Sequence, residues 1–305
     1  MKSVLTSVVF AFGAALSLSA LPAQAQTPSA SFDVGSIHVD QYGSGQPALI
    51  LIPGLTDSAA IWNATIAHFA PQHTIYALTL GGFGGRPAPA APVVDKADAD
   101  ITALITQHNI SKPVLIGHSL GGHVALRLAA EHSDLLRGVI SVDGTPIFPG
   151  YEKMTPAQRA ASANGIASQI RSLTPEQFQA GERQMMLPYL TKPQNVDAVA
   201  AAGQGADPAA SAEYMTELMS ADIRPQLAKI TVPLLEIMPF DASLDPQNPQ
   251  TPFRSEAQKQ QYYSALLASA KTARIATVND SRHFVMYDQP QQFYTLVQNF
   301  LANLP

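Results

Sequence analysis

The stretch GHSLG places Ser119 between two glycines, and its surroundings make this serine a candidate nucleophile. The apolar run VLI precedes the stretch, and an amphipathic pattern over 120–132 follows it. A serine at a sharp turn from a buried strand into a helix adopts a strained backbone conformation that exposes its hydroxyl at the C-terminal edge of a sheet. The five-residue pattern alone recurs by chance, but in this context it predicts that Ser119 attacks a substrate.

A serine hydroxyl is a weak nucleophile at neutral pH, so Ser119 needs a base within hydrogen-bond reach. His283 is the best candidate, because its loop follows the last predicted strand, 273–278, and precedes the last predicted helix, 290–302. His118 adjoins the serine and is predicted to line the pocket. Five further histidines are expected to be surface or packing residues: His68, His73, His108, His123 and His132.

The base in turn needs a carboxylate that fixes its tautomer and stabilises the imidazolium ion. Asp241 is the first choice, because it follows the apolar run LLEIMPF and gives the chain order Ser, Asp, His. Two alternatives stay open: Asp143 ends another apolar run, GVISV, and Asp245 lies four residues after Asp241 in the same loop. The carboxylates that do not take this role are expected to be turn or capping residues.

Attack on a carbonyl group also needs hydrogen-bond donors for the oxyanion that forms. The first predicted donor is the backbone N–H of Leu120, directly after the serine. The second is the backbone N–H of Leu55, because the proline-glycine step in LIPGLTDSAAIW turns the chain after an earlier apolar run. The residues predicted to contact the substrate are Gly54, His118 and Trp62.

These side chains need a frame in which strands and helices alternate, and the sequence predicts one. Continuous apolar runs are typical of strands covered on both faces, and their alternation with helical patterns predicts a mostly parallel α/β sheet flanked by helices. The predicted strands are 36–42, 48–53, 73–80, 114–117, 138–142, 232–238 and 273–278. The predicted helices of this frame are approximately 57–69, 95–108, 120–132, 255–270 and 290–302.

Residues 146–229 contain no convincing strand and carry helix-start signals instead. TPAQ from Thr155 and TPEQ from Thr174 each combine an N-cap threonine, a proline in the first turn and a glutamine that can close a capping box. Asp207, before a proline, is a third start. Because this block lies between two core strands, it is predicted to be a helical cap inserted before the last two strands. Its apolar residues could line a cavity or simply attach the cap: Met185, Met186, Leu187, Tyr189, Met215 and Met219.

The first 25 residues are typical of a secretory signal peptide. Lys2 gives a positive start, an apolar run covers 4–21, and AQA at 23–25 is a small-x-small cleavage site. Cleavage near Ala25/Gln26 would make the mature protein secreted or periplasmic, with no stable membrane anchor. The following QTPSAS is expected to be a disordered tail.

Composition narrows the classes of function. The 305 residues have a formal charge of -5 and no basic run, which argues against nucleic acid and anionic membranes as partners. The absence of cysteine excludes disulfides, thiolate zinc sites and cysteine nucleophiles. The histidines form no ligand-like cluster, so no metal site is predicted.

The motifs together resemble those of the α/β-hydrolase superfamily, especially its capped esterase-like and haloperoxidase-like members, over nearly all of the mature chain. Pro53, Gly54, Ser58 and Trp62 form P-G-x-x-x-S-x-x-x-W where many relatives have H-G-x-x-x-S-x-x-x-W. TLGGFGGRPAP occupies the place of the family's D-x-x-G-x-G-x-S loop, and P-F-D replaces its usual G-x-x-D. The resemblance implies an α/β-hydrolase fold, with a core of 26–145 and 230–305 and a cap of 146–229.

The sequence thus predicts a secreted serine hydrolase that cleaves carboxylic esters or related acyl compounds of small molecules, without a cofactor, through an acyl-enzyme intermediate. A serine in place of an aspartate nucleophile argues against haloalkane dehalogenases and epoxide hydrolases, which the fold also serves. Lactonase, aminopeptidase, haloperoxidase and C–C hydrolase activities remain alternatives. So does a ligand-binding protein on a hydrolase fold. The oligomeric state stays open.

Overall fold

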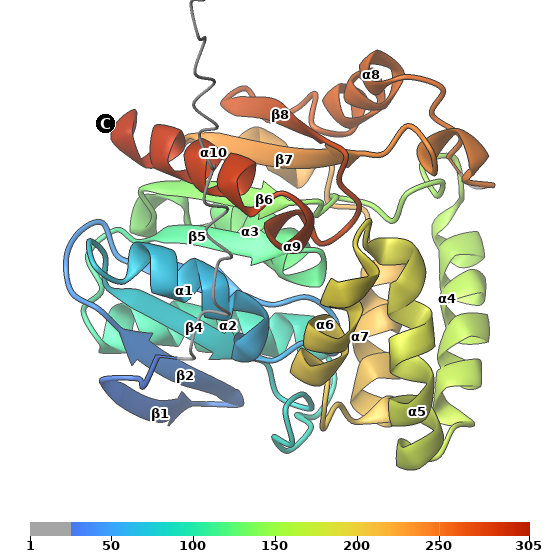
Figure 1. Ribbon diagram of the computed structural model, residues 1–305, viewed down its shortest axis with the longest axis horizontal. Coiled ribbons are helices and arrows are strands. Elements are labelled where there is room, and N and C mark those ends of the chain that lie inside the picture. The colour runs from blue at the N-terminus through green and yellow to red at the C-terminus, as the bar shows by residue number, and fades with distance from the viewer. Residues whose placement is uncertain (1–25, 250) are drawn as a thin grey trace, which may run out of the picture.

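A computed structural model describes residues 26–249 and 251–305, so the predicted signal peptide, 1–25, lies outside the described residues. Eight strands form one sheet in the order β1-β2-β4-β3-β5-β6-β7-β8 (Figure 1). Only the β1–β2 and β2–β4 pairs are antiparallel, and all the other neighbours are parallel. The strands are β1 (Ala30–Val34), β2 (Ile37–Tyr42), β3 (Leu49–Ile52), β4 (Ile75–Thr79), β5 (Val114–His118), β6 (Gly138–Val142), β7 (Leu234–Phe240) and β8 (Ala273–Asn279).

The strands at the centre of the sheet are buried on both faces, as continuous apolar runs require. In β3, Ile50 and Ile52 join one apolar cluster, and Leu49 and Leu51 join the other. Side chains of α2 and α3 fill the first cluster, and those of α1 and α10 fill the second. The sheet is therefore covered on both sides, which confirms the predicted fold class.

The helices of this core alternate with its strands, as Figure 1 shows. They are α1 (Asn63–Phe69), α2 (Val93–Gln107), α3 (Leu120–His132), α8 (Glu256–Leu266), α9 (Val285–Asp288) and α10 (Pro290–Ala302). Short 3₁₀ helices connect many of the elements: Ala59–Trp62, Ser133–Leu135, Leu187–Tyr189, Pro193–Asn195, Gln226–Lys229 and Asp245–Gln247. Within the described part of the chain, no helix is both long and apolar enough to span a bilayer.

Four helices between β6 and β7 gather beyond the C-terminal ends of the parallel strands (Figure 1). They are α4 (Pro156–Arg171), α5 (Pro175–Met186), α6 (Val196–Ala202) and α7 (Pro208–Ser220). Thr155 and Thr174 close capping boxes, and the Asp207 side chain accepts from two N–H groups of α7. Those three predicted helix starts are confirmed.

Hydrogen bonds hold the end of α6 and the segment before α7 against the core. The N–H and hydroxyl of Ser58 both donate to the carbonyl of Ala202, at 2.9 and 2.8 Å. The N–H of Gly85 donates to the carbonyl of Gly205 at 2.8 Å. The loop after β3, in which an oxyanion donor is predicted, is therefore linked directly to the helices above it.

Two parts of the secondary structure differ from the prediction. β1 begins at Ala30, inside the QTPSAS stretch that was expected to be disordered, because 30–34 pairs with β2 as an edge strand. α6 and α9 were not predicted at all. They are only seven and four residues long, and such short helices have little periodic signal of their own.

Candidate active site

Ser119 occupies a sharp turn between β5 and α3, with φ 54° and ψ -115°. The positive φ is a strained conformation for a residue with a side chain. The two glycines of GHSLG allow the turn, because a Cβ at Gly117 would lie 2.0 Å from the carbonyl oxygen of Gly121. Ser119 itself is partly exposed. The local geometry is therefore the one expected of a nucleophile at a strand-to-helix turn.

His283 lies in the loop between β8 and α9, and its Nδ1 is 2.6 Å from Oδ2 of Asp143. With the proton on Nδ1, the imidazole donates to this carboxylate and leaves Nε2 free to accept a proton. The hydroxyl of Tyr263 donates to the other oxygen, Oδ1. Burial would raise the pKa of Asp143, but the His283 hydrogen bond and charge, with Lys259 and Tyr263, lower it to about 2. Asp143 is therefore an ionised acceptor at neutral pH.

The turn that carries Asp143 packs directly against the start of α3. A Cβ at Gly122 would lie 2.8 Å from the Cα of Gly144, so the two glycines let the backbones approach. The N–H of Ser119 donates to the carbonyl of Val142 at 3.0 Å. Asp143 has φ 51°, a left-handed conformation that Asp tolerates better than most residues. This packing places the carboxylate next to the serine turn.

The prediction that Asp241 orients the base is wrong, because the structure gives His283 the carboxylate of Asp143. Both oxygens of Asp241 have other donors. Oδ1 accepts from the N–H and hydroxyl of Ser243, and Oδ2 is 2.5 Å from Nε of Arg282. The other alternative, Asp245, forms an ion pair with Lys259 at 2.8 Å and also caps the Asp241 N–H.

His118 is buried at 1% exposure and contacts the base loop, so it does not line an open pocket as predicted. Its Nε2 is 3.0 Å from the backbone carbonyl of His283, to which the N–H donates. The two rings lie 4.5 Å apart between centroids. Burial, with the nearby His283, lowers the pKa of His118 to about 3. His118 is therefore a neutral donor that links the serine turn to the His283 loop.

The predicted oxyanion donors lie on neighbouring segments. Leu120 opens α3, where N–H groups have no partner within the helix. Leu55 lies in the loop after β3, and its N–H makes no hydrogen bond within the described residues. A Cβ at Gly121 would lie 2.3 Å from the carbonyl oxygen of Ile52, so the start of α3 packs on the end of β3. The roles of both leucines stay predictions.

Trp62 and Gly54, both predicted to contact the substrate, are both buried, but the structure excludes this role for Trp62 only. Trp62 is fully buried and packs on Phe293, with ring centroids 6.4 Å apart, so it is a core residue and not a contact of the substrate. Gly54 is buried beneath the serine turn, where a Cβ would lie 3.0 Å from Nδ1 of His118 and 3.1 Å from Oδ2 of Asp57. Its small size is required by packing, and its contact with substrate stays a prediction.

Tyr189 of the cap lies near His283, with its ring centroid 5.4 Å from that of His283. Its side chain is 43% exposed, and Met185 nearby in the sequence is 44% exposed. In contrast, Met186 and Met219 are buried, and Met186 belongs to the apolar cluster that also contains Phe293 of α10. Met186 therefore helps to attach the cap, and a cavity lined by the exposed pair stays a prediction.

Sequence reasoning missed three buried groups near this site: Asp57, Glu236 and Tyr263. Asp57 lies in the loop after β3, Glu236 lies in the middle of β7, and Tyr263 lies on α8. A glutamate inside the apolar run LLEIMPF was the one visible signal, because a buried carboxyl in a central strand needs a reason. Nothing in the spacing of Tyr263 relates it to Asp143.

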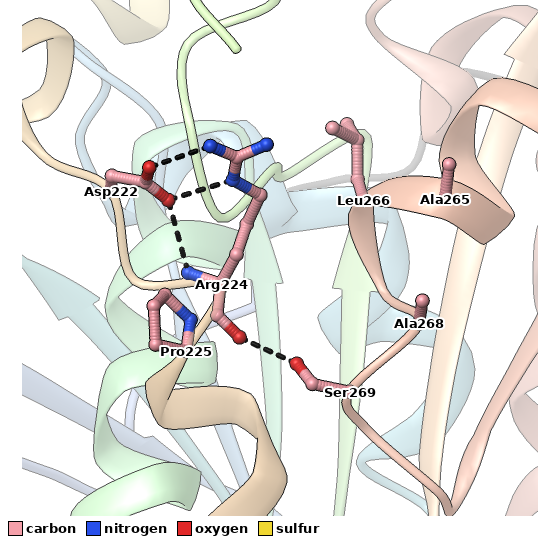
Figure 2. Close-up of a pocket in the computed structure, with 7 residues that line it drawn as sticks. All are labelled: Asp222, Arg224, Pro225, Ala265, Leu266, Ala268 and Ser269. Atoms are coloured by element: carbon pink, nitrogen blue, oxygen red, sulfur yellow. Dashed lines mark hydrogen bonds and ion pairs between the residues drawn. The ribbon is translucent and has the colours of Figure 1, made fainter. Parts of the chain in front are cut away.

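No group of three His, Cys, Asp or Glu among residues 26–249 and 251–305 is arranged to hold a metal ion. A surface pocket of about 340 Å³ lies between the segment at 222–225 and the end of α8 (Figure 2). Figure 2 shows the Arg224 guanidinium facing Asp222, and the two form an ion pair of 2.7 Å. Because its charged groups bind each other and no candidate site residue lines it, we assign this pocket no role.

Both the sequence and the fold of this chain are similar to those of known proteins. A model of the alpha/beta hydrolase family matches residues 49–296. The pimeloyl-(acyl-carrier protein) methyl ester esterase of Aeromonas hydrophila is 24% identical over 284 residues, 88% of this chain and 100% of that protein. Lipase LipV of Mycobacterium tuberculosis is 35% identical over 115 residues, 37% of this chain and 44% of the lipase. The match thus spans less than half of that lipase.

Solved structures share the fold over most of the chain. An esterase from Exiguobacterium antarcticum superposes with a TM-score of 0.71 at 17% identity, covering 88% of this chain and 96% of that one. An enol-lactonase from Burkholderia xenovorans gives a TM-score of 0.68 at 20% identity, covering 90% of this chain and 100% of that one. At these identities the likeness concerns the fold alone.

Proposed function

The chain belongs to the α/β-hydrolase family, and we propose that it is a serine hydrolase that cleaves carboxylic esters or related acyl compounds through Ser119, His283 and Asp143. The observation that carries the proposal is the 2.6 Å contact of His283 with Asp143 beside the strained turn of Ser119. A nucleophile, a base and an orienting carboxylate are the three parts that acyl transfer by a serine needs.

The reaction begins when Nε2 of His283 removes the hydroxyl proton as Oγ of Ser119 attacks the substrate carbonyl carbon. The backbone N–H groups of Leu120 and Leu55 stabilise the oxyanion. The C–O bond to the leaving alcohol then breaks, and the alcohol takes the proton from His283. Water attacks the acyl-enzyme with His283 again as base, which releases the carboxylic acid and restores Ser119. Asp143 stays ionised throughout and stabilises the imidazolium.

Two features support an ester or a related acyl compound as the substrate. The relative from Aeromonas hydrophila is named a methyl ester esterase, and the one from Mycobacterium tuberculosis is named a lipase. An exposed apolar residue of the cap, Tyr189, lies near His283 and fits an uncharged, moderately hydrophobic substrate. Lactone hydrolysis uses the same steps, because a lactone is a cyclic ester whose alcohol stays attached to the product.

The test is covalent labelling by a fluorophosphonate probe, together with hydrolysis of nitrophenyl esters and lactones of graded acyl length. The wild-type protein should be labelled and should hydrolyse at least one short-chain ester. S119A should lose both properties and keep its melting temperature, and S264A, which changes an exposed serine on α8, is the matched control. Equal hydrolysis by wild type and S119A would refute the proposal, and a protein that binds the compounds without labelling would be a carrier.

We propose export as well, since residues 1–25 have the composition of a signal peptide. Expression of the full chain in a bacterium, followed by fractionation and mass determination, tests this. The expected product outside the cytoplasm begins at Gln26. Full-length protein confined to the cytoplasm would refute the proposal.

A further inference from the structure

Two buried side chains behind Asp143 take no part in the mechanism proposed above. Glu236 lies in the middle of β7 at 0% exposure, and Tyr263 lies on α8 at 5% exposure. Both contact or adjoin the turn that holds Asp143 and Gly144. A titratable group in the interior is costly unless it has a partner, so each calls for an explanation.

The burial of the Tyr263 hydroxyl is explained by its hydrogen bond to the carboxylate of Asp143. Its hydroxyl donates to Oδ1, and Nδ1 of His283 donates to Oδ2 at 2.6 Å. The two donors therefore fix the carboxylate from opposite oxygens, and rotation of the carboxylate about its terminal bond would break both hydrogen bonds. Hydrogen bonds to an ionised group are the stronger kind, which makes this arrangement effective.

The burial of the Glu236 carboxyl is explained if this group is protonated and therefore uncharged. Its carboxyl lies beside the hydroxyl of Ser141 and the N–H groups of Asp143 and Gly144. Within the described residues it has no ion-pair partner, and neither oxygen makes a hydrogen bond of ordinary geometry. The Ser141 hydroxyl instead donates to the carbonyl of Gly144 at 2.9 Å. An ionised Glu236 would be a second, unpaired carboxylate next to Asp143.

The groups that face Asp143 decide which of the two carboxyls carries the proton. Asp143 has His283, Lys259 and the Tyr263 hydroxyl around it, and these hold its pKa low against the effect of burial. Burial raises the pKa of Glu236 well above its usual range, and this effect, together with the charge of Asp143, outweighs the lowering by the Ser141 hydroxyl and the N–H groups of Asp143 and Gly144. When two carboxyls share a buried site, one of them keeps its proton. Here that one is Glu236.

We propose that Glu236 is a carboxylic acid that stays protonated at neutral pH beside the Asp143–Gly144 turn, and that Tyr263 fixes the carboxylate of Asp143, so that both act as positioning residues for His283. This inference rests on the proposed function, because it assigns a purpose to the orientation of His283. It adds that a neutral polar group is required at 236 and that a charge there would be harmful.

Three variants test the two roles. E236Q keeps the shape and neutrality of the protonated acid and should retain kcat/KM within about threefold of wild type. E236L removes the polar group and should lower kcat about tenfold or more with little change in KM. Y263F removes one hydroxyl and should lower kcat about tenfold, as expected for one hydrogen bond to a charged group. Y262F, which removes the neighbouring hydroxyl that donates to Glu152, is the matched control.

Two further readouts separate positioning from a merely structural role. Without the Tyr263 hydroxyl, more negative charge remains on Asp143 and stabilises the imidazolium, so the acidic limb of the kcat/KM profile should move to higher pH in Y263F only. Carbon-13 NMR of the Glu236 carboxyl should report the protonated form at neutral pH in the wild-type protein. This measurement needs no turnover, so it decides the inference even if ester hydrolysis and probe labelling fail.

Three results would overturn the inference. The first is an ionised Glu236 by NMR at neutral pH. The second is a loss of kcat in E236Q as large as in E236L, which would mean that a neutral polar group at 236 does not suffice. The third is a pH profile of Y263F that coincides with those of wild type and Y262F.

Discussion

Asp143 and Asp241 are the two carboxylates that could orient His283, and replacing each of them by asparagine distinguishes their roles. In D143N the new amide would donate to Nδ1 of His283 and force the proton onto Nε2, where the imidazole can no longer accept from Ser119. Losing an orienting carboxylate in this way lowers kcat about a thousandfold to ten-thousandfold, or about 4–5.5 kcal/mol of transition-state stabilisation. The fold should survive, because the amide has the same shape.

D241N should have the opposite signature. Asp241 and Arg282 form a contact of 2.5 Å with side chains only 12% and 23% exposed, so neutralising one partner leaves a poorly solvated charge. The expected loss is about 1–3 kcal/mol of folding free energy, or a melting temperature lower by about 3–10 °C. Because Asp241 does not contact the His283 ring, kcat/KM should stay within about tenfold of wild type.

The assay measures kcat/KM for one nitrophenyl ester and the thermal melting curve of each variant, both at a temperature where all are folded. D143N should be inactive and stable, and D241N active and less stable. The reverse pattern, with D143N within tenfold of wild type and D241N a thousandfold slower, would refute the assignment of Asp143. Inactivity of both would mean that the base loop depends on both carboxylates.

The remaining predictions concern the turn beneath Asp143 and the junction of cap and core. G122A should reduce kcat/KM about tenfold and stability by about 1–3 kcal/mol in denaturant melts, because its Cβ would lie 2.8 Å from the Cα of Gly144. G165A, with open space around it, should do neither, and equal effects would contradict the close approach. Burial raises the pKa of Glu182, so the folded protein binds that proton more tightly and loses stability as pH rises above about 4.5. E182Q should therefore flatten the fall in melting temperature as the pH rises above about 4.5, unlike E213Q, whose side chain is 39% exposed, and parallel curves would contradict it.

The parts of this molecule that the sequence predicts well are those whose cause is local. The two threonine capping boxes and the Asp207 cap lie within four residues of the helices they start, so spacing alone reveals them. The turn at Ser119 needs glycines at fixed offsets and an apolar strand before it, which are also visible locally. Long apolar runs likewise predict the central strands, because burial on both faces leaves no alternation.

The parts that it predicts poorly depend on contacts between distant segments. Whether Asp143 or Asp241 contacts His283 depends on Arg282, which is remote from both in the sequence. Arg282 donates to the carboxylate of Asp241. The position of His118 beside Ser119 predicts a pocket-lining residue, but its side chain donates to the carbonyl of His283 instead. Trp62 likewise belongs to the core because of a distant contact: its ring packs against that of Phe293 on α10.

Arg282 precedes His283 directly, so one short loop contacts the carboxylates that follow two adjacent strands, β6 and β7. A single arginine in this loop can form an ion pair of 2.5 Å with only one of them. The carboxylate that binds the arginine is then not available to accept a hydrogen bond from His283. Arg282 also donates to the carbonyl of Leu190 in the cap at 3.1 Å, so the pair with Asp241 fixes the loop to both core and cap. The carboxylate after β7 therefore stabilises the loop, and the one after β6, free of any arginine, is left to orient the imidazole.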